Sequence, residues 1–126
     1  MSSLFYYKKN YEILKARDFL VVLPHLDDEF AIAPLLKLLV EKKINIKVIF
    51  CAERFKTNHK NREKRRKESF ASMALLGIET SNIFFLNDYF CVEDCLLYKS
   101  ANKIYKFLEK INKEYFFKNI ITLTLE

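Results

Sequence analysis

The chain has 126 residues, of which 51% are hydrophobic and 30% charged, a balance typical of one soluble globular domain spanning residues 1–126. Its single glycine excludes Gly-rich phosphate loops and dinucleotide-binding fingerprints, which need several glycines. Three cysteines exclude a secreted disulfide scaffold, and we find neither a signal-peptide pattern nor an apolar run long enough for a transmembrane segment, so we expect a cytoplasmic protein.

The first half of the chain predicts two strands joined by a helix. Phe19–Leu23 is apolar on both faces, which is typical of a central parallel strand covered by helices on both sides. A helical stretch follows and extends to about Lys42, and Pro34 marks either its late start or a kink. The second strand is predicted over Ile46–Cys51, with three alternate residues on one face: Ile46, Val48 and Phe50.

The second half continues this alternation of elements. A helix with Phe70, Met73 and Ala74 at helical spacing ends at Gly77, which suits a left-handed cap. Strands are predicted over Ile83–Leu86 and Asn119–Leu125, the latter apolar enough to be central, and residues 87–97 are irregular. Between them, the helix Ala101–Tyr115 has a predicted buried stripe of Ala101, Ile104, Leu108, Ile111 and Tyr115. The alternation predicts an α/β fold with a parallel sheet of about four strands.

The net charge of +6 is concentrated in one segment. Residues 53–68 hold eight basic and three acidic side chains, so this segment alone contributes +5. A solvated helix face explains such a run most simply, and a basic nucleic-acid-binding module is the alternative. The interspersed acidic residues and the scarcity of aromatic residues limit any nucleic-acid binding to a non-specific attraction. Cys91 and Cys95, with three residues between them and no second pair, make a poor zinc site.

Three chemically active side chains lie where the first predicted strand meets its helix: His25, Asp27 and Asp28. The carboxyl ends of strands are where open α/β sheets bind ligands. Imidazole and carboxylate groups are ligands of catalytic zinc, and a remaining carboxylate can act as general base toward the metal-bound water. By itself, an acidic run at a helix start is more often an N-terminal cap that compensates the helix dipole.

Residues 25–29 (His-Leu-Asp-Asp-Glu) resemble the His-Pro-Asp-Asp-Glu signature of the PIG-L (LmbE-like) de-N-acetylases. Further segments match in family order. Arg65–Glu68, followed nine residues later by Gly77, resembles the family's Arg-x-x-Glu helix, and Phe85–Asp88 and residues 118–125 resemble its third and fourth strands. The resemblance implies a Rossmann-like three-layer sandwich.

The same resemblance implies a zinc-dependent hydrolase that removes an N-acetyl group from an N-acetylglucosamine-type amino sugar conjugate, which can be linked to lipid or glycan. Carried over to this sequence, His25 and Asp28 would be zinc ligands and Asp27 the general base. Arg65 would lie near the anionic or sugar part of the substrate, and Asp88 would contact a sugar hydroxyl.

The sequence departs from the family pattern at several places. Leu26 replaces the usual proline, and residues 30–34 replace a small, Gly-rich helix start. The family's third zinc ligand is a histidine after the fourth strand, and neither histidine of this chain matches it. His59 and Glu126 fall on the same predicted sheet edge as His25, but a solvated loop histidine and a frayed terminal residue are the better interpretations.

The chain ends on a strand that looks buried, which predicts a C-terminally truncated, incomplete family fold. With two zinc ligands instead of three, we expect weak zinc affinity and little turnover. An uncovered apolar strand edge also predicts self-association. The alternative to an active hydrolase is therefore a catalytically inactive remnant of such an enzyme.

Overall fold

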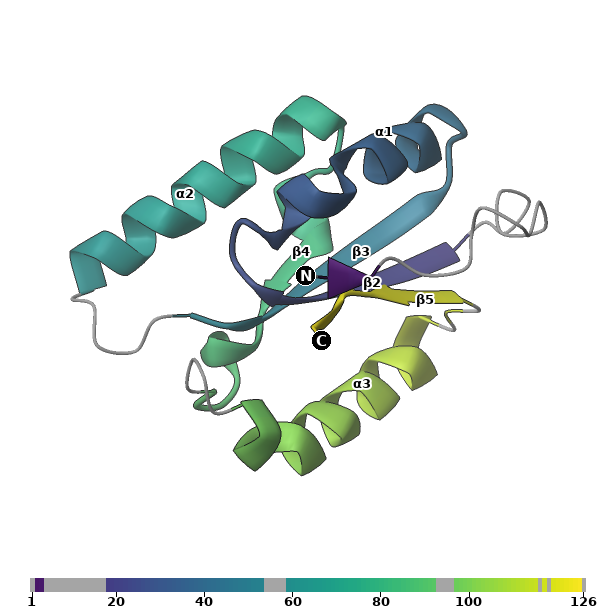
Figure 1. Ribbon diagram of the computed structural model, residues 1–126. Helices are drawn as coiled ribbons and strands as arrows, with labels where there is room; N and C mark the ends of the chain where they lie inside the picture. The colour runs from purple at the N-terminus through teal and green to yellow at the C-terminus, as the bar shows by residue number, and fades with distance from the viewer. Residues whose placement is uncertain are drawn as a thin grey trace.

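Figure 1 shows the computed structural model of the chain, which describes residues 2–3, 18–53, 59–92, 97–115, 117 and 119–125. Helices and strands alternate along the chain, as the hydrophobic pattern predicts. The strands are β1 (Ser2–Ser3), β2 (Asp18–His25), β3 (Asn45–Ala52), β4 (Ile83–Phe85), β5 (Asn119–Thr122) and β6 (Thr124–Leu125). The α-helices are α1 (Ala33–Glu41), α2 (His59–Leu76) and α3 (Ala101–Tyr115), and the 3-10 helices are η3 (Asp28–Ile32), η4 (Thr80–Asn82), η5 (Leu86–Asp88) and η6 (Leu97–Ser100).

Four strands form a parallel sheet in the order β4-β3-β2-β5, which confirms the predicted α/β class. β2 is central, because Leu20 pairs with Lys47 of β3 on one side and with Ile120 of β5 on the other. The expectation that the last strand is central is wrong: within the described residues, β5 is an edge strand of this sheet, and Ile120 is 58% exposed. β1 and β6 form a separate antiparallel pair.

Helices cover both faces of the sheet in a Rossmann-like three-layer sandwich, with α1 and α2 on one face and α3 on the other (Figure 1). Successive side chains of a strand point to opposite faces, so β2 contributes to two cores. Phe19, Val21 and Leu23 pack with α1 and α2, whereas Leu20 and Val22 pack on the α3 side. The apolar run in β2 is continuous because both faces of this strand are buried, as the sequence predicts.

The boundaries of α1 and α2 follow from one proline and one glycine. Pro34 occupies the first turn of α1, where a missing backbone N–H costs no hydrogen bond, so the predicted single helix is divided into η3 and α1. Gly77 ends α2 at a φ of 91°, as predicted. The backbone amides of Gly77 and Ile78 donate to the carbonyls of Ala74 and Met73, the Schellman pattern of hydrogen bonds.

The predicted buried stripe of α3 is only partly correct. Ile111 is buried and Ile104 and Leu108 are half-buried, but Ala101 and Tyr115 are exposed. The inner face of α3 also includes Phe107, whose ring contacts those of two residues that follow β4, Tyr89 and Phe90. Ala74 of α2, expected on the inner side, is exposed as well. In the described part of the chain, no helix is long and apolar enough to cross a membrane.

Candidate functional site at the carboxyl edge of the sheet

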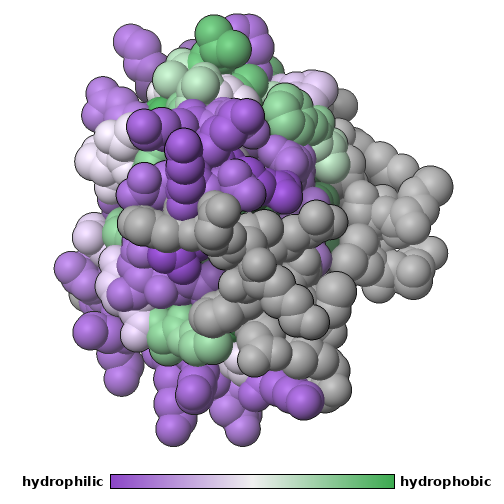
Figure 2. Space-filling view, turned by 90° about the vertical axis from the view of Figure 1, so that its left-hand side faces the viewer, coloured by the Kyte–Doolittle hydropathy of each residue, from purple (hydrophilic) through white to green (hydrophobic). Residues whose placement is uncertain are grey.

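The candidate site lies at one edge of the sheet, where three neighbouring parallel strands end. His25 is the last residue of β2, Glu53 directly follows β3, and Asp88 closes η5, which directly follows β4. The helix α2 begins at this same edge with His59, whose side chain lies outside the described residues, as does Glu126. Hydrophilic side chains cover most of the described surface on this side of the molecule (Figure 2).

The turn after β2 brings together the two predicted zinc ligands. Asp27 adopts the left-handed backbone conformation, with φ of 76°, which turns the chain sharply before η3 begins at Asp28. The Asp28 carboxylate then faces back toward His25: its Oδ2 accepts a 2.7 Å hydrogen bond from the His25 backbone amide and lies 3.7 Å from His25 Nδ1. A nitrogen and an oxygen donor therefore converge at the end of the central strand.

The separation of these two donors suits a shared metal ion. Two tetrahedral zinc ligands, each about 2.0–2.2 Å from the ion, lie about 3.3–3.6 Å apart. The 3.7 Å between His25 Nδ1 and Asp28 Oδ2 is close to that distance. The residues described by the structure contain no group of three or more His, Cys, Asp or Glu side chains that could hold a metal. A catalytic zinc uses three protein ligands, and this pair could supply two of them.

The predicted general base and the predicted substrate residue of α2 contact each other. Arg65 Nη2 donates to Asp27 Oδ2 at 3.0 Å. The Asp27 side chain is 55% exposed, so its carboxylate is accessible from solvent while one oxygen is held by the guanidinium. The sequence pattern does not foresee this contact, because 38 positions separate the two residues.

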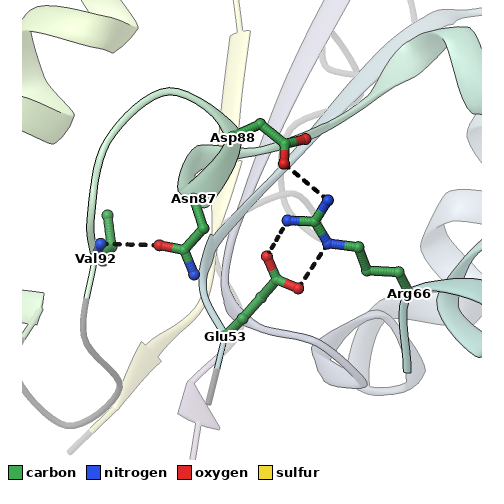
Figure 3. Close-up of polar contacts among 5 residues, drawn as sticks. All are labelled: Glu53, Arg66, Asn87, Asp88 and Val92. Carbon is green, nitrogen blue, oxygen red and sulfur yellow. Dashed lines mark hydrogen bonds and ion pairs between the residues drawn. The ribbon is translucent and has the colours of Figure 1, made fainter. Parts of the chain in front are cut away.

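The next residue of α2 joins the ends of the two other strands (Figure 3). Arg66 Nε donates to Glu53 Oε2 at 2.7 Å, and Arg66 Nη2 donates to Glu53 Oε1. Arg66 Nη1 donates to Asp88 Oδ1 at 2.8 Å. These hydrogen bonds, above all those with Glu53, raise the pKa of Arg66, so the guanidinium remains charged. Asp88 therefore lies at the carboxyl edge of the sheet, as predicted, and one oxygen of its carboxylate is bound by Arg66.

Glu53 and Arg66 are site residues that the sequence reasoning missed. A signal existed for Glu53, since a carboxylate directly after a buried strand reaches the same edge as the residues that follow β2. Arg66 follows Arg65 in a run of charged residues, and nothing in that local pattern distinguishes a paired arginine from a solvated one. Its side chain is only 19% exposed, and that of Glu53 only 4%.

Two buried groups near the turn have perturbed acidities. Burial raises the pKa of Glu29, whose Oε1 accepts a 2.8 Å hydrogen bond from Ser72 of α2. Burial, together with the nearby negative charge of Asp28, raises the pKa of the Cys51 thiol to about 12. At neutral pH Cys51 is therefore a protonated thiol, whereas zinc binds the thiolate.

Comparison with known protein families identifies the family of this chain. Residues 20–126 match the model of the family PIG-L, described as GlcNAc-PI de-N-acetylase. The chain belongs to the PIG-L family. No curated protein and no solved structure matches it significantly. Membership in the PIG-L family points to a hydrolase of the deacetylase kind.

Proposed function

We propose that this PIG-L protein is a zinc-dependent hydrolase that removes the N-acetyl group from an N-acetylglucosamine-type amino sugar conjugate. The observation that carries the proposal is the pair His25 and Asp28, whose donor atoms lie 3.7 Å apart at the carboxyl end of β2, with Asp27 immediately before Asp28 in sequence. The family match over residues 20–126 supports the same reaction class.

His25 and Asp28 would hold the metal ion, with a further ligand from outside the described residues. When bound, zinc polarises a carbonyl group and lowers the pKa of water to about 7. The hydrogen bond from the His25 amide holds the Asp28 carboxylate in a fixed direction, which limits the reorganisation needed for metal binding.

Asp27 would act as the general base. Arg65 holds its Oδ2 at 3.0 Å, so Oδ1 is the oxygen available to accept the proton of the attacking water. Attack on the acetyl carbon and cleavage of the C–N bond release acetate, and Asp27 returns the proton to the departing amine. Exposure of the Asp27 carboxylate gives the substrate access from solvent.

A second candidate is a catalytically inactive member of the family. The observation that favours it is that the described residues contain no group of three potential metal ligands. Such a protein would keep the fold and the strand-end carboxylates but hold zinc too weakly for turnover.

The test measures bound zinc by elemental analysis and acetate release from an N-acetylglucosamine conjugate, with zinc in excess because weak affinity is expected. We expect Asp27→Asn to retain zinc and lose at least about a hundredfold in turnover, and Asp28→Asn to lose zinc. Asp18→Asn, at the opposite end of β2, is the matched control and should behave as wild type. Absence of zinc-dependent acetate release from the wild type would support the inactive alternative.

A further inference from the structure

Arg66 connects two carboxylates that differ strongly in exposure. Glu53 is 4% exposed and receives two hydrogen bonds from the guanidinium, whereas Asp88 is 54% exposed and receives one. The buried pair is the anchor, because a bidentate contact fixes both the position and the plane of a guanidinium. The plane is held further by Phe85, whose ring centre lies 4.2 Å from Arg66 Cζ.

Asp88 is held from its backbone side as well as through its side chain. Its short helix is closed by hydrogen bonds from the amides of Tyr89 and Phe90 to the Leu86 carbonyl. The adjacent Asn87 accepts a 2.8 Å hydrogen bond from the Val92 amide, which secures the following loop (Figure 3). With Oδ1 bound to Arg66, Oδ2 of Asp88 accepts no hydrogen bond from any other described residue.

We propose that Arg66 is a positioning residue for substrate: anchored by Glu53 and Phe85, it orients Asp88 so that the second carboxylate oxygen accepts a hydrogen bond from a hydroxyl of the amino sugar. This inference rests on the proposed function and extends it to two residues, Glu53 and Arg66. The polar partners of Arg66 among the described residues are Glu53 and Asp88, and do not include His25, Asp27 or Asp28, so we expect the pair to act on substrate affinity and to leave the chemical step and the metal unaffected.

The test compares Arg66→Lys with wild type in the acetate-release assay. A lysine keeps the charge but lacks the planar fork, so it cannot hold Glu53 and Asp88 together. We expect KM to rise about tenfold, as for one lost charge-assisted hydrogen bond, with kcat within about twofold and zinc affinity unchanged. The dissociation constant of N-acetylglucosamine, measured by NMR titration, should rise by the same factor. Arg62→Lys, on the same helix, is the matched control.

A double-mutant cycle separates positioning from general stability. If Arg66 acts through Asp88, Asp88→Asn raises KM by itself and Arg66→Lys adds no further increase in that background. Glu53→Gln, which loosens the anchor without removing Arg66, should give a similar rise in KM. Urea unfolding of each variant confirms that the folded protein is assayed.

The outcomes distinguish this inference from the proposed function. An active wild type whose KM is unchanged in both Arg66→Lys and Glu53→Gln would overturn the inference alone. Additive effects of Arg66→Lys and Asp88→Asn, or a fall in kcat or zinc affinity, would also overturn it. A wild type that neither binds N-acetylglucosamine nor releases acetate would overturn the proposed function and this inference together.

Discussion

Replacing Gly77 with alanine tests how firmly the end of α2 is determined, and α2 carries both arginines of the site. Gly77 has a φ of 91°, and a Cβ atom placed there would lie 2.7 Å from Val40 Cγ1 of α1. The left-handed conformation costs an alanine about 1–2 kcal/mol. Relief of the steric overlap costs about 1–3 kcal/mol more, because Val40 has a stiff branched side chain. We therefore expect Gly77→Ala to lower the free energy of unfolding by about 2–5 kcal/mol.

The assay is equilibrium urea unfolding followed by circular dichroism. With a denaturant slope of about 2 kcal/mol per molar, the midpoint should fall by about 1–2.5 M. Val40→Ala serves as the partner variant, since it removes the atom that overlaps. In a Gly77→Ala background it should restore about 1 kcal/mol, leaving the backbone cost in place, whereas in the wild type it should destabilise the half-buried contact.

Two results would refute this reasoning. A loss below about 0.5 kcal/mol in Gly77→Ala would show that neither the backbone conformation nor the close approach to Val40 constrains the helix end. Strict additivity of Gly77→Ala and Val40→Ala would show that the cost does not arise from the contact between α1 and α2.

Three further predictions concern buried polar groups and the sheet edge. Because the pKa of Cys51 is raised to about 12 in the folded state, the protonated thiol contributes fully to stability below pH 9, and this contribution is lost as the pH rises toward 12. Cys51→Ala should therefore flatten the decline of the unfolding free energy between pH 9 and 12, and iodoacetamide should modify exposed Cys91 before buried Cys51. Ser72→Ala removes a hydrogen bond from buried Glu29 and should cost about 1–3 kcal/mol in urea unfolding. Ile120→Lys should reduce self-association in sedimentation velocity without lowering the urea midpoint, because Ile120 is exposed on edge strand β5.

Several features of the fold could be predicted from local sequence because local sequence causes them. A strand with apolar residues on both faces must be covered twice, and β2 is an interior strand of the sheet with a core on each side. Gly77 is the helix terminator because it adopts the left-handed conformation without steric cost. The meeting of His25 and Asp28 was also predictable, since only a turn of two residues separates them.

The remaining features depend on contacts between segments far apart in the chain. The edge position of β5 is decided by the order of strands in the sheet, which the apolar character of one strand does not encode. The partners of Arg65 and Arg66 are decided by where α2 crosses the strand ends: consecutive residues on a helix point in different directions, so one arginine reaches Asp27 and the other reaches Glu53 and Asp88. Sequence alone thus determined the alternation of helices and strands, the two buried faces of β2 and the short turn that brings His25 and Asp28 together. Only tertiary structure decided which charges meet, because ion pairing depends on the distance between strand ends that the fold brings together.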